Sequence, residues 1–279
     1  MLDVVPQCGL CNRLRVLLSA LAVSTEEETP VRVAWEPTDE CRATFGRLFV
    51  SVDGGLFSVG PRRWWERPVT RRNLHWPWAV RLLMGYRLQR AAYRPAHAGE
   101  VAELLRRHGK VYLSTPYSLR PYSRDYVSRL RPVEKLQKRI DLLVSRFAPH
   151  TVGVHIRRTD NTASMGHGTP DDFRRAMDAE LSRRPGVCFY LSTDDDALKA
   201  ALLREYAGRV IAQTAPVRRD TPEGMEEAVV DLWCLAATER LLGSYWSSFT
   251  DTAAEIGGMP VEIVGKEVAA SKTNSTERQ

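Results

Sequence analysis

Apolar positions along this chain change their spacing at regular intervals, and the spacing predicts alternating strands and helices. Leu2–Val5 and Val31–Trp35 are short apolar runs typical of buried strands. Between them, Asn12–Val23 carries leucines three and four residues apart, as one face of a helix does. The chain therefore opens as a strand–helix–strand unit, and Val111–Ser114 reads as a further strand.

The second half alternates regularly between the two spacings. A helix is expected to begin at Pro132, which suits a first helical position. Strands are then predicted at Thr151–Ile156, Val187–Ser192, Val210–Ala212, Leu241–Ser244 and Val261–Val264, with helices at Asp171–Arg184, Asp195–Ala207, Glu223–Thr238 and Thr250–Gly257. Strands that alternate with helices indicate a parallel sheet covered on both faces. The polar tail, residues 266–279, is expected to be disordered.

The middle of the chain has a different composition. Residues 60–146 contain 20 Lys and Arg but 6 Asp and Glu, a net charge of +14, whereas the whole chain carries +6. Most of the basic residues are arginine, whose planar fork suits phosphate and carboxylate groups. Ala79–Tyr93 is predicted to be helical. The segment also holds four tryptophans that either pack internally or stack on carbohydrate, namely Trp64, Trp65, Trp76 and Trp78.

Several protein classes lack their sequence signals here. No apolar run approaches the 18 residues of a membrane span, and Leu2–Pro6 is too short for a signal peptide, so we expect a cytoplasmic protein. The five cysteines are too sparse for a disulfide framework, and Cys8 and Cys11 form a CxxC without the second pair that a zinc site requires. Neither GxxxxGK[ST] nor GxGxxG occurs, which argues against ATPase and NAD-dependent functions.

Three polar clusters follow predicted strands directly. They are HIRRTD at His155–Asp160, STDDD at Ser192–Asp196, and SYWSSFTD at Ser244–Asp251. In a parallel sheet of this type, ligands bind outside the carboxyl ends of the strands. The three clusters therefore predict one ligand site at that edge.

The chemistry of the clusters indicates a nucleotide diphosphate. Arg157 or Arg158 can bind phosphate through two parallel hydrogen bonds, and strand alternation turns the two to opposite faces, so one of them is expected to reach the ligand. Serines before a helix add hydroxyls and backbone N–H groups for an anion. The acceptors for a base edge or ribose are Asp194, Asp195 and Asp231, and the serines are Ser247 and Ser248.

Each of these residues also has a purely structural interpretation. Arg157 could pair locally with Asp160, and the Asp194–Asp195 and Ser247–Ser248 pairs could be helix caps. Asp231 could be an exposed carboxylate in mid-helix, and His155 a hydrogen-bonded core histidine.

The motifs resemble one superfamily, which contains α-1,6-fucosyltransferases, nodulation fucosyltransferases and protein O-fucosyltransferases. HIRRTD resembles its H-[VI]-R-R-x-D motif, and the Gly9–Leu14 turn resembles its G-x-x-N-[RQ]-L motif. STDD matches [AS]-T-D-D, and residues 229–249 resemble the closing D…S-S segment. The resemblance covers residues 2–50 and 150–258, and it makes the CxxC incidental to a glycine turn.

The resemblance implies a GT-B-like fold of two Rossmann-like halves. Residues 1–148 would form an abbreviated acceptor-side half with a helical basic insert at about 60–146, and residues 149–265 would bind the GDP-sugar. It also implies inverting transfer without a metal or a cofactor. The donor-binding residues it suggests are Asn12, His155, Arg158, Thr193, Asp194, Asp195, Asp231, Ser247 and Ser248.

Roles follow from the same resemblance. Arg157 would pair with the donor β-phosphate and stabilise the leaving diphosphate. His155 would contact the nucleotide, and Asp231 would accept from the guanine edge. Ser247 and Ser248 would bind phosphate, and Asn12 would approach it from the other half.

One departure from the family leaves the general base unassigned. The α-1,6 enzymes carry Lys directly after the motif and Glu a few residues on, where this chain has Asn161 and Met165. Asp160, His167 and Asp171 are candidates, and a departing phosphate that takes the proton is the alternative.

The leading hypothesis is a glycosyltransferase that uses GDP-fucose or a related GDP-sugar. Its acceptor would be a glycan, a lipid-linked sugar or an envelope polysaccharide. The basic segment could hold the enzyme at an anionic membrane surface. The alternatives are a catalytically silent nucleotide-sugar-binding protein and a nucleic-acid-binding protein; the chain contains no recognised nucleic-acid-binding module, so we expect no nucleic-acid partner.

Overall fold

The computed structural model describes two compact units. Unit 1 comprises residues 1–133 and 219–222, and unit 2 comprises residues 134–218 and the described chain from 223 on. The predicted boundary after residue 148 therefore lies too late, because helix α6 (Glu134–Val144) belongs to unit 2. The described residues exclude 62, 64–66, 71–72, 76–78, 80–82, 84, 86–87, 92–98, 159–165, 216–217, 219 and 266–279.

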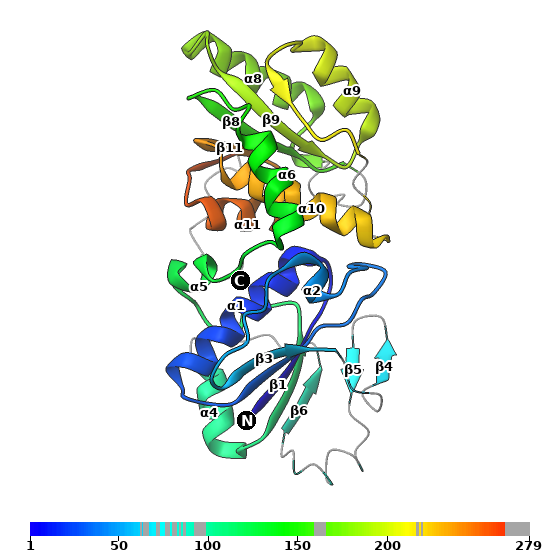
Figure 1. The fold of residues 1–279 in the computed structure, drawn as a ribbon, viewed down its shortest axis with the longest axis vertical. Coiled ribbons are helices and arrows are strands. Elements are labelled where there is room, and N and C mark those ends of the chain that lie inside the picture. The colour runs from blue at the N-terminus through cyan, green and yellow to red at the C-terminus, as the bar shows by residue number, and fades with distance from the viewer. Residues whose placement is uncertain are drawn as a thin grey trace. The chain divides into compact units, whose positions relative to one another are not determined.

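Unit 1 is built on a five-stranded sheet (Figure 1). All neighbouring strands are parallel and follow the order β3-β2-β1-β7-β6. The strands are β1 (Leu2–Pro6), β2 (Val31–Ala34), β3 (Phe57–Gly60), β6 (Leu88–Ala91) and β7 (Val111–Thr115). The helices are α1 (Leu10–Glu26), α2 (Phe45–Leu48), α4 (Glu100–His108) and α5 (Arg124–Ser128). The first half thus contains a sheet of five parallel strands.

The basic middle segment differs from its prediction. Where Ala79–Tyr93 was expected to be one helix, residues 88–91 form β6, which pairs in parallel with β7. Arg67–Thr70 (β4) and Asn73–His75 (β5) form an antiparallel pair. The open edge of β7 offers backbone hydrogen bonds that override the helical spacing, which is a tertiary effect. Trp64, Trp65, Trp76 and Trp78 lie outside the described residues, as does the predicted disordered tail.

A buried arginine closes the turn between β1 and α1. Arg13 is 2% exposed and donates to Cys8 O at 2.8 Å, Glu36 O at 2.5 Å and Thr38 Oγ1 at 2.6 Å. Its guanidinium also lies 5.4 Å from the ring centre of Trp35. The planar guanidinium group of Arg13 thereby joins the turn to the loop after β2.

Unit 2 has a second five-stranded sheet with the parallel order β10-β9-β8-β11-β12. Its strands are β8 (Thr151–Ile156), β9 (Cys188–Thr193), β10 (Val210–Ile211), β11 (Arg240–Gly243) and β12 (Val261–Ile263). Its other helices are α8 (Pro170–Arg183), α9 (Asp196–Glu205), α10 (Pro222–Ala236) and α11 (Ser248–Gly257). Every predicted element of this half is present, with ends shifted by a few residues.

Strand alternation distributes the helices over the two faces of this sheet (Figure 1). One face carries Val152, Val154 and Leu242, which pack with residues of α8 and α9 in a buried core. On the other face, Gly153 lies against Leu235 of α10 and Thr238 just after it, and Gly243 lies against Thr250 of α11. A residue at the end of β8 therefore meets α11 when its number is odd.

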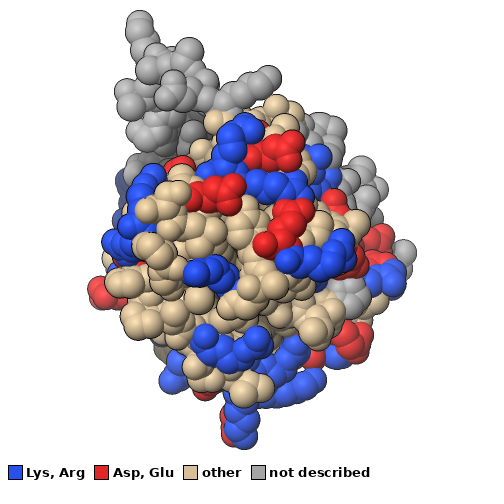
Figure 2. All heavy atoms as spheres, turned by 90° about the horizontal axis from the view of Figure 1, so that it is seen from above, with Lys and Arg blue, Asp and Glu red and all other residues tan. Residues whose placement is uncertain are grey.

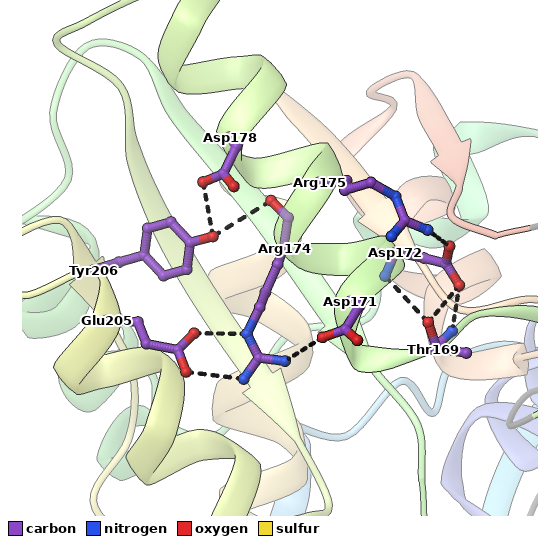
Figure 3. Close-up of polar contacts among 8 residues, drawn as sticks. All are labelled: Thr169, Asp171, Asp172, Arg174, Arg175, Asp178, Glu205 and Tyr206. Atoms are coloured by element: carbon purple, nitrogen blue, oxygen red, sulfur yellow. Dashed lines mark hydrogen bonds and ion pairs between the residues drawn. The ribbon is translucent and has the colours of Figure 1, made fainter.

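The outer helices of unit 2 are joined by surface ion pairs (Figure 3). Arg174 of α8 donates to both carboxylate oxygens of Glu205 on α9, at 2.7 and 2.9 Å. Thr169 and Asp172 form a capping box that begins α8. Acidic and basic side chains are intermixed on the face shown in Figure 2.

Among the helices of the described residues, none is long and apolar enough to cross a membrane.

Candidate active site

The carboxyl ends of β8 and β11 meet at the point where the strand order of the unit 2 sheet reverses. β8 has β9 on one side, and the chain returns after α10 to place β11 on the other side. Gly243, the last residue of β11, is in register with His155. Ligands of doubly wound sheets bind at such a switch point. The predicted clusters HIRRTD and SYWSSFTD therefore begin side by side.

His155 is a fixed, buried ring at this point. It is 6% exposed, its Nδ1 lies 2.8 Å from Thr250 Oγ1, and it stacks on Phe249 with ring centres 4.9 Å apart. Gly243 permits this arrangement, because a Cβ there would overlap the Thr250 methyl group. The imidazole orientation is thus set by α11.

Ser244 ties the two strand ends together. Its hydroxyl donates to His155 O at 3.1 Å and accepts from the Arg157 backbone N–H at 2.9 Å. Arg157 Nε is buried. The residue that the resemblance assigns to the β-phosphate is therefore held at the backbone by the segment that leads to the serine pair.

The start of α11 has the properties of an anion site. Ser247 is the N-cap, is 3% exposed, and makes no capping hydrogen bond. Its buried Oγ has no hydrogen-bond partner within the described residues. A buried hydroxyl without a partner costs about 1–3 kcal/mol. A bound anion at this helix N-terminus would supply the missing partner.

His167 lies over the segment between β11 and α11. Its ring stacks on Tyr245 with centres 4.3 Å apart. Gly168 passes so close to Val264 that an added Cβ would lie 2.7 Å from the Val264 carbonyl oxygen. This close approach, together with the stacking, places a candidate base beside the serine loop.

The end of β9 is organised by its aspartates. Asp194 Oδ1 accepts from the Arg158 backbone N–H at 2.7 Å, which joins this cluster to the end of β8. Asp195 is the N-cap of α9 and accepts from Leu198 N at 2.9 Å. Thr193 Oγ1 accepts from Asp195 N at 3.2 Å. The cap interpretation of Asp195 is thereby confirmed, and the donor-binding roles of these residues stay predictions.

Asp231 is buried in α10 and is not an exposed carboxylate. It is 3% exposed and accepts from Tyr190 Oη at 2.6 Å, Ser192 Oγ at 2.7 Å and Gln213 Nε2 at 2.5 Å. Burial raises the pKa of this carboxyl group, and the three hydrogen bonds oppose the rise. The predicted hydrogen bond from a guanine edge to Asp231 stays a prediction. It would use the carboxylate lone pairs that the three internal donors leave available.

The remaining predicted residues are dispersed. Asn12 lies in unit 1 on the first turn of α1, beyond the end of β1. Asp171 is on α8, where it pairs with Arg174 at 3.0 Å. Asp160 lies outside the described residues, as do the positions of the missing Lys and Glu. No group of three or more potential metal ligands occurs among the residues that the structure describes, and no disulfide joins the described cysteines.

Three contributors to the site were missed from the sequence. Thr250 and Phe249 fix His155, and Gly243 makes room for Thr250. The polar cluster after β11 included the first two, but their role depends on contacts that form only when α11 folds back onto β8.

Comparison with solved structures gives this architecture a precedent. The NodZ α-1,6-fucosyltransferase co-crystallised with GDP aligns with a TM-score of 0.61 and 16% identity, over 90% of this chain and 91% of that one. POFUT1 in complex with GDP aligns at 0.59 and 10% identity, over 95% and 98%. The chain has the fold of these fucosyltransferases.

Two further comparisons complete this finding. A mutant of Arabidopsis thaliana FUT1 in complex with GDP aligns at 0.60 and 12% identity, over 93% of this chain and 69% of that one. No protein-family profile matches the sequence, and a comparison with curated proteins finds no relative. The α/β, GT-B-like fold predicted from the motifs is thus confirmed by structure, at sequence identities that establish the fold alone.

Proposed function

We propose that this chain is an inverting glycosyltransferase that moves fucose from GDP-fucose to a saccharide acceptor without a metal ion. The observation that carries the proposal is the buried Ser247 hydroxyl at the start of α11, which has no hydrogen-bond partner among the described residues. It follows β11, whose last residue is in register with His155 at the switch point of the sheet. Solved structures of the same fold hold GDP or were soaked with GDP-fucose, which supports the choice of ligand.

The reaction would be a single displacement. An acceptor hydroxyl oxygen attacks the anomeric carbon, and the bond from that carbon to the β-phosphate oxygen breaks with its electron pair leaving on GDP. Arg157, Ser247 and the N–H groups at the start of α11 would stabilise the charge that develops on the diphosphate. Attack from the face opposite the departing phosphate inverts the anomeric centre.

The acceptor proton needs a destination. His167 is one candidate base, since an imidazole nitrogen can accept a proton and this ring is held against Tyr245 beside the serine loop. Asp160 is the other, and the departing phosphate could accept the proton in their place. The variant His167→Gln tests the histidine route. If activity is lost while GDP affinity is unchanged, His167 accepts the proton, and if activity is retained, one of the other two routes operates.

The donor class is tested by thermal shift with GDP, UDP, ADP and CMP, each with and without EDTA. Ligand at about 100 times its dissociation constant adds roughly 2.7 kcal/mol, which corresponds to about 5–10 °C at 2–4 °C per kcal/mol. Of the four nucleotides, we expect that GDP alone raises the melting temperature, and that it does so equally in EDTA. If none of the four nucleotides shifted the melting temperature of a protein shown to be folded, the proposal would be overturned.

Two helix caps of the same unit give a matched pair of variants. Ser247→Ala removes a buried hydroxyl that has no partner among the described residues, so it should raise the stability of the free chain by up to about 1–3 kcal/mol and weaken GDP binding by about tenfold or more. Thr169→Ala removes a satisfied cap of α8, so it should cost about 1 kcal/mol of stability and leave GDP affinity unchanged. The reverse pattern would contradict the anion site at α11.

A catalytically silent nucleotide-sugar-binding protein is the second candidate. Asn161 and Met165, where the family has Lys and Glu, favour it. GDP-fucose that is bound but neither hydrolysed nor transferred to any saccharide acceptor would identify this function, whereas turnover would exclude it.

A further inference from the structure

Trp246 has an unusual backbone conformation for a bulky residue. Its φ is 52°, in the left-handed region where non-glycine residues are uncommon and an aromatic side chain is an outlier. Such a backbone conformation raises the free energy of the folded chain by about as much as one favourable contact lowers it. It persists where the surrounding structure enforces it. Trp246 immediately precedes Ser247, so the strained residue adjoins the anion site.

The three consecutive side chains around Trp246 have different surroundings, and the Trp246 ring centre lies 6.0 Å from that of Tyr245. Tyr245 stacks on His167, and the Ser247 hydroxyl is buried. Trp246 between them is 59% exposed, and it is the one aromatic residue among the large exposed hydrophobic residues of the described part of the chain. An indole is therefore turned outward beside a buried phosphate-binding hydroxyl.

We propose that the Trp246 indole binds the sugar ring of the nucleotide sugar and thereby distinguishes GDP-fucose from GDP. This inference rests on the proposed function, because it takes the diphosphate to lie at Ser247. The sugar is bonded directly to the β-phosphate, whereas the base is separated from it by the ribose and the α-phosphate. An aromatic face one residue from the phosphate site is thus placed to meet the sugar.

Two other occupants fit less well. A protein partner would need a contiguous apolar patch, whereas Trp246 is the one aromatic side chain among the large exposed hydrophobic residues that the structure describes. A guanine base can stack on an indole, but the ribose and the α-phosphate separate it from the β-phosphate, so it would lie farther from Ser247 than the sugar does. The C–H face of a pyranose requires only a flat apolar surface.

The test is isothermal titration calorimetry with GDP and with GDP-fucose on wild type, Trp246→Gly, Trp246→Phe and a control, Val261→Ala. Val261 is a partly exposed residue at the other end of the sheet, where β12 begins. Glycine adopts a positive φ without strain, so Trp246→Gly removes the indole without opposing the loop conformation. Melting temperatures of all variants are recorded to confirm that they fold.

We expect Trp246→Gly to bind GDP as wild type does and to bind GDP-fucose about 3- to 10-fold more weakly, as expected for loss of one aromatic contact. Trp246→Phe should lose less, and Val261→Ala should change neither affinity. Equal losses for both ligands, or no loss, would overturn the assignment of the indole to the sugar. If wild type bound neither ligand, the proposed function itself would fail, and this inference with it.

Discussion

Gly243 is the position at which one added methyl group should disturb the site most directly. An alanine Cβ there would overlap the Thr250 methyl carbon and lie 3.1 Å from Thr250 Oγ1. Thr250 is fully buried and holds the His155 ring. The methyl must displace α11 or the threonine, and overpacking of this kind costs about 1–3 kcal/mol. Gly243→Ala should therefore lower stability and disorder His155 together.

The Thr250→Ser substitution isolates the cause. It removes the methyl group that the new alanine Cβ would strike and keeps the hydroxyl that His155 uses. Alone it should cost about 0.8 kcal/mol, the value of one buried methyl group. Together with Gly243→Ala it leaves room for the new Cβ, so the double variant should cost less than about 1 kcal/mol. The two single costs would sum to roughly 2–4 kcal/mol if they were independent.

Urea unfolding of the wild type, both single variants and the double variant measures this coupling, with GDP affinity as a second readout. We expect the double variant to be more stable than Gly243→Ala alone and to recover GDP binding. Additive costs, within about 0.5 kcal/mol, would refute the reasoning, because they would mean that the glycine accommodates a side chain without moving Thr250.

Three further predictions concern the rest of the fold. Arg13→Lys should destabilise the chain by about 2–4 kcal/mol in urea unfolding, because one ammonium nitrogen cannot reach the three acceptors that Arg13 contacts from three separate nitrogens. A variant as stable as the wild type would contradict this prediction. Burial raises the pKa of Asp231, so its contribution to stability is full below about pH 4, the unfolded value, and is lost as the pH rises through the folded pKa. The stability lost in Asp231→Asn should thus be larger at pH 4 than at pH 7, and a pH-independent difference would count against it. A double-mutant cycle on Arg174 and Glu205 should give about 0.2–1 kcal/mol at low salt and near zero in 1 M NaCl, because both side chains are partly exposed.

Sequence reasoning succeeded where local pattern and sheet geometry coincide. Unit 2 alternates apolar runs with helical spacings, and polar clusters follow three of its strands, so the sheet and the polar residues at its carboxyl edge were predictable. The prediction for the basic middle segment was wrong for the opposite reason. Residues 88–91 carry a helical spacing but lie against the open edge of β7, and a strand edge is a long-range feature that local spacing does not contain.

The candidate site shows the same division at the level of single residues. Ser247 and Arg157 could be named as candidates from the sequence, since the capacity to bind an anion is a property of residue type, and their roles stay predictions. Asp231 was recognisable as an acceptor, but its three donors come from β9 and from the segment after β10, so its buried network could not be foreseen.

By itself, the sequence determined the alternation of elements, the parallel sheet of the second half and the chemistry at its edge, because each depends on side-chain type and on spacings within a few residues. Tertiary structure alone decided that β11 returns beside β8, that α11 locks His155 through Thr250, and that Trp246 faces outward beside a buried hydroxyl. The contact of His155 with Thr250 joins residues 95 positions apart. Such pairings arise from packing of the whole sheet, which a local pattern does not encode.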